Sequence, residues 1–295
     1  MAKPEDATDK LSAYASLLHS WLAARLSADA LGWLDQQIAS VAAGDRTLAL
    51  GLAIGLAPRK VGKADFDLTA AEKEAGQHLR PGLDASGWSL DQGARILLAL
   101  TSFRGDEAAF AAGLDRVFAT AEIGEQIALL KGLALFPAPK LFIARAAEGV
   151  RSAMQPVFEA VAHANPYPRE EFSEAQWNQM VVKALFIGSR LAPIQGLDAR
   201  RNADLARMLI DYADERRAAG RSISPELWRC VAPFATEKDV ARLGAILRDG
   251  TEAEAAGAAL ALADCPLPSA RDAIEARPEL ASAIKDGQLT WAAVA

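Results

Sequence analysis

The stretch KLSAYASLLHSWLAARL, residues 10–26, contains the pattern from which the rest of the chain can be interpreted. Its large apolar residues recur mainly at steps of three and four along the chain. They are Leu11, Tyr14, Leu18, Trp21, Leu22 and Leu26. Because an α-helix turns once every 3.6 residues, this spacing places them on one face, and the stretch is predicted to form an amphipathic helix.

The apolar composition of the whole chain supports the same interpretation. Among its 295 residues are 65 Ala and 37 Leu, but only 11 Val and 13 Ile. Ala and Leu are strong helix formers, whereas β-branched residues favour strands, so a sheet-rich fold is not expected. The hydrophobic content of 51% is sufficient to fill a core.

Capping signals divide the chain into short helices. Thr69 and Glu72 form a capping box, which predicts a helix from residue 70 to about residue 79. Similar pairs are Ser173 with Gln176, Thr236 with Asp239, and Thr251 with Glu254. Further starts are predicted at Ser89, Asp106, Thr120, and Ser224 followed by Pro225. The signals together predict about fourteen helices.

Many short amphipathic helices with short connections favour antiparallel helix pairs. The predicted fold is therefore all-α, an irregular array of antiparallel helix pairs resembling a HEAT-like α-solenoid, with a large helical bundle as the alternative. Residues 1–295 are expected to form a single helical domain, with a sub-boundary near 137–139 where Pro137 and Pro139 interrupt the chain.

Several functional classes lack their sequence signals. The net charge of −6 argues against nucleic-acid binding. Three His and two Cys without a motif argue against zinc, and no cofactor or metal is expected. A P-loop, a nucleophile elbow and a dinucleotide-binding turn are missing, so the sequence leaves enzymatic activity undecided. No transmembrane segment or signal peptide is expected, and the two Cys without a disulfide framework fit a cytoplasmic protein.

Unusual residues concentrate in residues 163–229. This interval holds two of the six Trp, two of the three Tyr and all three Asn. Residues 183–229 contain nine basic and six acidic side chains, a local charge of +3. They form either a face that attracts anions or a set of ion pairs that fix loops to helices.

Residues 165–168, Asn-Pro-Tyr-Pro, predict a rigid connector. Two prolines one residue apart favour an extended segment that cannot continue the preceding helix. Tyr167 is then either packed on a neighbouring helix or part of a loop that lines a ligand site. His163 follows Glu159 by four residues, so the two can share one side of a helix.

The helix predicted after Ser173 carries Trp177 on its apolar face and Asn178 at the edge of that face. A carboxamide at such a position needs hydrogen-bond partners. Asn178 is expected to bond either to a neighbouring backbone or to a polar pocket that includes Lys183.

Residues 197–202 lead into the next predicted helix, which either Asp198 or Asn202 caps. On that helix Arg207 and Asp211 form an i, i+4 pair. Asp211, Asp214 and Glu215 share one face, which we interpret as solvated or salt-bridged rather than metal-binding. Acid–base catalysis by His163, Asp198 or Asp211 is the catalytic alternative.

The candidate ligand-binding residues are therefore polar or aromatic and lie in this one interval. They are His163, Asn165, Tyr167, Trp177, Asn178, Lys183, Asp198, Arg200, Arg201, Asn202, Asp211 and Arg229.

Seven motifs in this order resemble the EboA family. They are NPYP at 165–168, WNQM at 177–180, KALF at 183–186, GLDARRN at 196–202, LARMLIDYA at 205–213, ERRAAGR at 215–221 and PELWR at 225–229. The motif-bearing core spans 151–234.

The resemblance implies a place in a bacterial gene cluster that makes or moves a small metabolite, a pigment precursor in some cyanobacteria. It implies possible partners in the same cluster, including a UbiA-like prenyltransferase and a TatD-like hydrolase, or a small metabolite as ligand. We therefore expect a helical binding or scaffold protein. The alternative is an α-helical enzyme acting on a small, prenylated or polyol-like intermediate.

Overall fold

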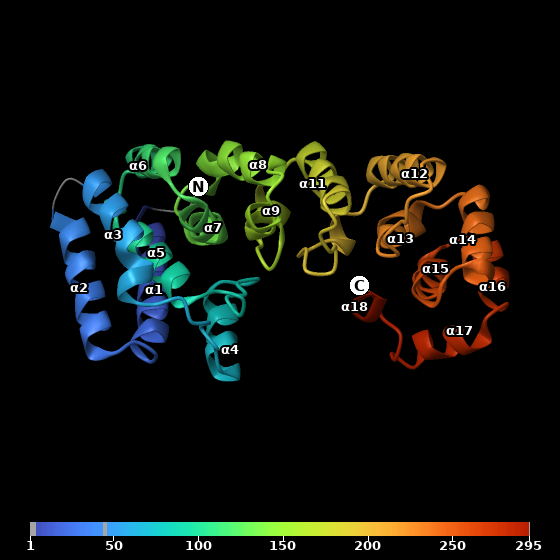
Figure 1. Ribbon diagram of the computed structural model, residues 1–295, viewed down its shortest axis with the longest axis horizontal. Helices are drawn as coiled ribbons and strands as arrows, with labels where there is room; N and C mark the ends of the chain where they lie inside the picture. Colours follow the sequence, from blue (N-terminus) through green and yellow to red (C-terminus); the bar gives the residue numbers. More distant parts are fainter. Residues whose placement is uncertain (1–3, 44–45, 295) are drawn as a thin grey trace. The chain divides into compact units, whose positions relative to one another are not determined.

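The computed structural model describes residues 4–43 and 46–294, and the chain divides into two compact units, Met1–Phe172 and Ser173–Ala295. The described residues contain 18 α-helices, four short 3-10 helices and no β-strand, which confirms the all-α fold (Figure 1).

The division between the units does not fall at the expected sub-boundary near 137–139. Pro139 begins the 3-10 helix η2 (Pro139–Phe142), which contacts α6 (Glu107–Thr120) before it and α8 (Ile143–Arg151) and α10 (Tyr167–Glu171) after it. The chain before and after these prolines therefore packs into the same unit. The expectation that residues 1–295 form a single domain stays a prediction.

The first unit contains ten α-helices. They are α1 (Pro4–Ala23), α2 (Ala28–Ala43), α3 (Arg46–Lys60), α4 (Ala70–Leu79), α5 (Leu90–Thr101), α6 (Glu107–Thr120), α7 (Ile123–Lys131), α8 (Ile143–Arg151), α9 (Gln155–Ala162) and α10 (Tyr167–Glu171). The short 3-10 helices η1 (Leu133–Leu135) and η2 lie between α7 and α8.

Helix α5 lies at the centre of this unit and contacts α1, α2, α3 and α7 (Figure 1). Because it is covered on several sides, all of its residues from Leu90 to Leu100 except Gln92 are buried. Two of them are charged: Arg95 and Asp91 form an ion pair of 2.8 Å. Arg95 also donates to the carbonyl oxygens of Ile54 and Gly124, so the buried guanidinium ties α5 to α3 and to the start of α7.

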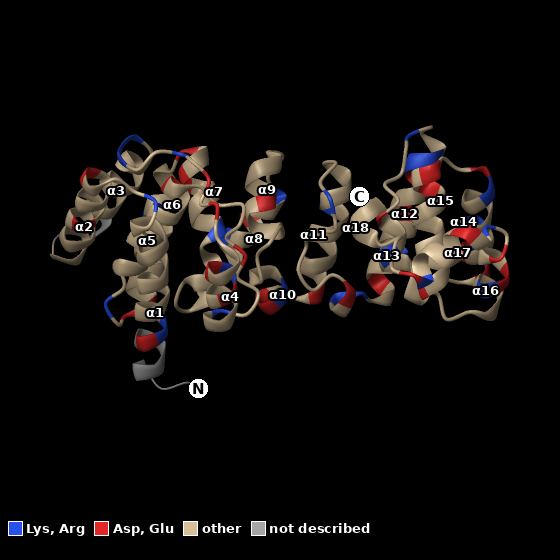
Figure 2. Cartoon of the chain, turned by 90° about the horizontal axis from the view of Figure 1, so that it is seen from below, with Lys and Arg blue, Asp and Glu red and all other residues tan. Residues whose placement is uncertain are grey.

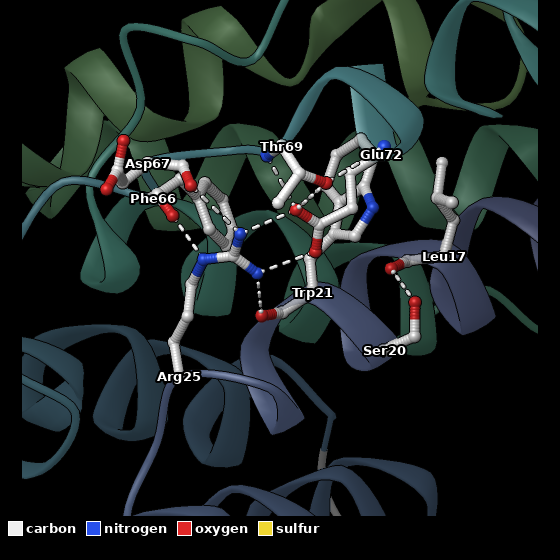
Figure 3. A network of polar contacts seen from close by, with 8 residues as sticks. All are labelled: Leu17, Ser20, Trp21, Arg25, Phe66, Asp67, Thr69 and Glu72. Atoms are coloured by element: carbon white, nitrogen blue, oxygen red, sulfur yellow. Dashed lines mark hydrogen bonds and ion pairs between the residues drawn. The ribbon is translucent and has the colours of Figure 1, made fainter. Parts of the chain in front are cut away.

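A second arginine fixes the loop between α3 and α4 onto α1. Arg25 donates to Glu72 through two bonds of 2.8 and 2.7 Å, and it also donates to the carbonyl oxygens of Phe66 and Asp67 (Figure 3). Glu72 accepts from the backbone and hydroxyl of Thr69 as well, so the ion pair and the cap of α4 share one carboxylate (Figure 3).

Phe66 connects this loop to α5 and to the segment before it. Its amide donates to the carbonyl oxygen of Trp88 at 2.9 Å. Its ring packs against α5 so closely that a Cβ added to Gly93 would lie 2.3 Å from the ring. Glycine at residue 93 is therefore required for this close approach, and Phe66 holds Trp88 in place.

The second unit contains eight α-helices. They are α11 (Glu174–Phe186), α12 (Ala203–Ala218), α13 (Leu227–Val231), α14 (Glu237–Asp249), α15 (Glu252–Asp264), α16 (Pro268–Ile274), α17 (Pro278–Lys285) and α18 (Trp291–Val294). The Ala-rich helix α15 contacts α13, α14, α16, α17 and α18. A Cβ added to Gly257 of α15 would lie 2.6 Å from Pro225, so glycine permits this close packing.

The capping boxes predicted from the sequence are confirmed. Helix α4 begins at Ala70 after Thr69, and α11, α14 and α15 begin after Ser173, Thr236 and Thr251. Asp106 caps α6 by accepting from the amide of Ala109 at 2.9 Å.

Two predicted starts and the number of helices are wrong. Thr120 is the last residue of α6, and α7 begins after Glu122 instead. Residues 225–226 form a turn after Ser224, so α13 begins at Leu227 rather than at Pro225. The described residues contain more than fourteen α-helices because several are only four to seven residues long.

In the part of the chain that the structure describes, no helix combines the length and the apolar character that crossing a membrane requires.

Candidate functional site

The first unit contains a cavity of about 430 Å³. Helices α5, α7 and α9 and the segments 84–88 and 163–165 surround it. Its lining residues are Asp84, Gly87, Trp88, Gln92, Ile127, Lys131, Pro156, Glu159, Ala160, His163, Ala164 and Asn165. Its volume lies within the range of small-molecule sites, and its wall combines apolar surface with a few polar groups, as such sites do.

Lys131, the last residue of α7, is the principal cation of this wall. Its Nζ donates to the carbonyl oxygen of Gly87 and to Oε1 of Gln92, both at 2.8 Å. Burial lowers the pKa of Lys131, and the more distant carboxylates of Asp91 and Asp65 offset this effect only in part. Lys131 is therefore a partly desolvated amine that is held by neutral oxygens.

His163 and Glu159 lie on the same wall. Nδ1 of His163 is 3.9 Å from Oε1 of Glu159, which confirms that the two residues share one side of the chain around the end of α9. Glu159 also accepts from Nε2 of Gln155 at 2.7 Å. The cavity thus carries an imidazole and a carboxylate as well as the amine of Lys131.

Asn165 shapes the cavity through backbone contacts. Its Nδ2 donates to the carbonyl oxygens of Leu130 and Ala160, and its Oδ1 accepts from the amide of Tyr167. Both donors of the carboxamide are used in this way, so Asn165 fastens the 163–167 segment to α7 and α9. Ala164 beside it has a φ of 49°, in the left-handed region, and this turn brings the segment back to the cavity.

Tyr167 packs on a neighbouring element rather than lining the cavity. It is 1% exposed, and its hydroxyl donates to the carbonyl oxygen of Pro139 at 2.5 Å. Burial raises the pKa of Tyr167. The predicted extended connector is wrong, because Tyr167 and Pro168 form the first turn of α10. The backbone nitrogens of a first turn have no hydrogen-bond partner within the helix, so a proline fits there.

The other nine candidate residues lie in the second unit, and two of them form a pair of carboxamides. Nδ2 of Asn178 donates to Oδ1 of Asn202 at 3.1 Å, and Nδ2 of Asn202 donates to Oδ1 of Asn178 at 2.9 Å. Asn202 also caps α12 by accepting from the amide of Leu205, which confirms one of the two predicted caps. Asn178 therefore bonds to a side chain, which neither sequence alternative included.

Trp177 and Arg200 form a second contact in this unit. The guanidinium of Arg200 lies 4.7 Å from the centroid of the buried indole. This distance is within the range of a cation–π interaction. Lys183 of α11 makes a similar contact within its own helix, with Nζ 5.5 Å from the ring centroid of Phe186.

Asp198 is the centre of an arginine cluster. Arg229 donates to both of its oxygens at 2.8 and 2.7 Å, and these bonds lower the pKa of Asp198. Arg201 donates to the carbonyl oxygens of Asp198 and Arg229 and to the carboxylate of Asp264. These bonds join the 198–201 segment to α13 and to the end of α15.

Asp211 lies apart from the contacts just described. Its side chain is 72% exposed and pairs with Arg207 at 3.6 Å, as predicted for these positions. Asp214 pairs instead with Arg242 at 2.7 Å. In the described part of the chain, no group of three or more His, Cys, Asp and Glu side chains is placed to hold a metal ion.

The structure thus brings His163 and Asn165 to one cavity and assigns most of the remaining candidates to local pairs. For the basic interval 183–229, the contacts of Arg201, Arg207 and Arg229 agree with the ion-pair alternative. Figure 2 shows acidic and basic residues interspersed along the helices of this unit.

A larger cavity of about 600 Å³ lies beside α6, α7, α8 and α9 in the first unit. Two arginines, Arg145 and Arg151, line it, and Arg145 pairs with Asp115 at 2.9 Å and with Glu148 at 2.7 Å. The lining of this cavity includes none of the residues singled out from the sequence, whereas His163 and Asn165 both line the cavity at Lys131. We therefore take the cavity at Lys131 as the candidate site.

Comparison with known proteins places the chain in a family. The family model described as metabolite traffic protein EboA matches residues 14–232, which is more than half of the chain. The chain belongs to the EboA family. The match includes every residue that lines the candidate site, and α14 to α18 lie beyond it. Neither a curated protein nor a solved structure matches the chain significantly.

Of the residues that line this cavity of the EboA-family chain, the sequence identified only His163 and Asn165 as candidate ligand-binding residues. Lys131, Gln92 and Trp88 are separated by tens of residues from His163 and belong to no spacing motif. The only local signal is the break after Lys131, where Gly132 ends α7.

Proposed function

We propose that this member of the EboA family binds a small metabolite in the cavity at Lys131. The observation that carries the proposal is a cavity of about 430 Å³ whose ammonium group donates only to neutral oxygens. A ligand that supplies an acceptor would complete the hydrogen bonds of this desolvated group. The family description, which refers to metabolite traffic, agrees with a binding role.

The wall offers both parts of a selective site. Apolar surface comes from Trp88, Ile127, Pro156 and Ala160. The polar side chains around Lys131 offer hydrogen bonds that would orient a ligand. Such a combination lets burial provide affinity while a few hydrogen bonds provide specificity.

The test uses two Trp variants of α7. Ile127→Trp places an indole in the cavity, whereas Ile123→Trp changes an exposed residue of the same helix that does not line it. The full chain is incubated with a small-molecule extract of its source cells and washed, and the retained compounds are released and identified by mass spectrometry.

The wild-type chain and Ile123→Trp are expected to retain the same compound, and Ile127→Trp is expected to lose it. The proposal is refuted if the wild-type chain retains nothing beyond Ile127→Trp, or if Ile127→Trp retains the compound in full. Circular dichroism of both variants confirms that they are folded.

An enzymatic role is the second candidate, and His163 beside Glu159 on the same wall supports it. An imidazole near a carboxylate can transfer protons. Chemical conversion of the retained compound by the wild-type chain, lost in His163→Gln, is the expected result for an enzyme. Recovery of an unchanged compound supports binding alone.

A scaffold role for other proteins of a gene cluster stays a prediction from the sequence. Co-purification of the chain with the UbiA-like or TatD-like protein at low salt tests it, and the absence of any complex would contradict it.

A further inference from the structure

We infer that the ligand of this cavity is a small organic acid whose single carboxylate binds Lys131 and Gln92. The inference rests on the proposed function and deepens it by naming the class of ligand.

Lys131 has an unused donor. An ammonium group has three N–H donors, and two are given to Gly87 and Gln92. Among the side chains that the structure describes, no carboxylate lies within ion-pair distance of Nζ. The carboxylate of Asp91 is already paired with Arg95 at 2.8 Å. The third donor of Lys131 is therefore available to an anion.

Gln92 supplies a second donor. Its Oε1 accepts from Nζ of Lys131 at 2.8 Å and from the amide of Ser89 at 3.3 Å, which fixes the orientation of the carboxamide. Its Nε2 donates to no group among the described residues. The two nitrogens lie about 5 Å apart or less, because the oxygen and nitrogen of a carboxamide are about 2.3 Å apart. One carboxylate can accept from both.

The remaining charges limit the ligand to one negative charge. Asp84 and Glu159 also line the cavity, and they would repel a second anionic group. The indole of Trp88 and the side chain of Ile127 favour an apolar or aromatic body. A phosphate monoester, with its greater charge, fits this wall less well than a carboxylate does.

The experiment compares four fluorinated probes by ligand-observed fluorine NMR: 4-fluorobenzoate, 4-fluorophenyl phosphate, 4-fluorobenzamide and 4-fluorobenzylamine. The proteins are the full wild-type chain, Lys131→Met, Lys131→Arg and Lys140→Met. Lys140 is an exposed lysine of the same unit that does not line the cavity, so its variant controls for the loss of one positive charge. Lys131→Arg keeps the charge if Lys131→Met fails to fold.

The wild-type chain is expected to bind 4-fluorobenzoate at least tenfold more tightly than each of the other probes. Lys131→Met is expected to lose this preference, while Lys131→Arg and Lys140→Met retain it. The inference is overturned if the amide, the amine or the phosphate binds as tightly as the benzoate, or if Lys131→Met keeps the preference. Failure of 4-fluorobenzoate to bind also overturns it, but the proposed function fails only if no compound is retained from the extract.

Discussion

Replacing Gly93 by Ala is predicted to destabilise the first unit by about 2 kcal/mol. The added Cβ would lie 2.3 Å from Cζ and 2.5 Å from Cε2 of Phe66, at least 1 Å inside the usual carbon–carbon contact of about 3.5–4.0 Å. Phe66 is fully buried, and its backbone is held by Arg25 and Trp88, so the ring cannot retreat without moving the loop. Overpacking of this kind costs about 1–3 kcal/mol, and we use the upper value because the backbone is fixed. Replacing glycine by alanine in a helix interior raises the free energy of unfolding by about 1 kcal/mol, which leaves the net loss of about 2 kcal/mol.

The matched control is Gly32→Ala. Gly32 lies inside α2, and a Cβ added there would meet no atom within 4 Å. This variant is therefore predicted to be more stable than the wild-type chain by about 0.5–1 kcal/mol.

Urea and thermal denaturation followed by circular dichroism measure both changes. For a unit of this size, the loss at residue 93 corresponds to a decrease in Tm of about 4–8 °C. If Gly93→Ala proved as stable as Gly32→Ala, Phe66 would not be packed against α5 as described, and the position of Trp88 at the cavity would lose its support.

Three further predictions concern the polar contacts. Glu72→Gln is predicted to lower stability by about 2 kcal/mol near pH 6 because Arg25 loses its charged partner. The bonds from Arg25 lower the pKa of Glu72 from 4.5 to about 2, so the stability that the ion pair contributes is present above pH 4.5 and disappears toward pH 2. Urea titrations of the wild-type chain and of Glu72→Gln should therefore converge toward pH 2. A difference between the two proteins that stays constant with pH would contradict the ion pair. Asn178→Ala is predicted to lower the free energy of unfolding by about 2 kcal/mol because it leaves the carboxamide of Asn202 partly unsatisfied. Urea denaturation measures this loss, and an unchanged midpoint would contradict the pairing of the two carboxamides. Asp211→Asn is predicted to change the free energy of unfolding by less than about 0.5 kcal/mol because its ion pair is exposed, and a larger loss would assign it a role that the structure does not show.

The helices that the sequence predicted well are those with local signals. A capping box joins residues three apart, so Thr69 with Glu72 and Ser173 with Gln176 reveal the start of a helix without any tertiary information. The errors occur where one residue type suits two structures. Pro168 ends one helix and also fits the first turn of the next, so residues 165–168 did not distinguish an extended connector from α10.

The site was predicted only in part because packing assembles it. His163 and Asn165 belong to an unusual interval, and both line the cavity. Lys131 could not be found in the same way, because its partners are a backbone carbonyl and a distant glutamine. The pairing of Asn178 with Asn202 likewise spans 24 residues and leaves no periodic signal.

Amide hydrogen exchange of the full chain, compared before and after exposure to the source-cell extract, locates the bound metabolite. We predict slower exchange in α7 and in residues 84–92 and 159–165, with no change in residues 173–295. Protection confined to residues 173–295, or no protection in either unit, would contradict the assignment of the metabolite site to the cavity at Lys131.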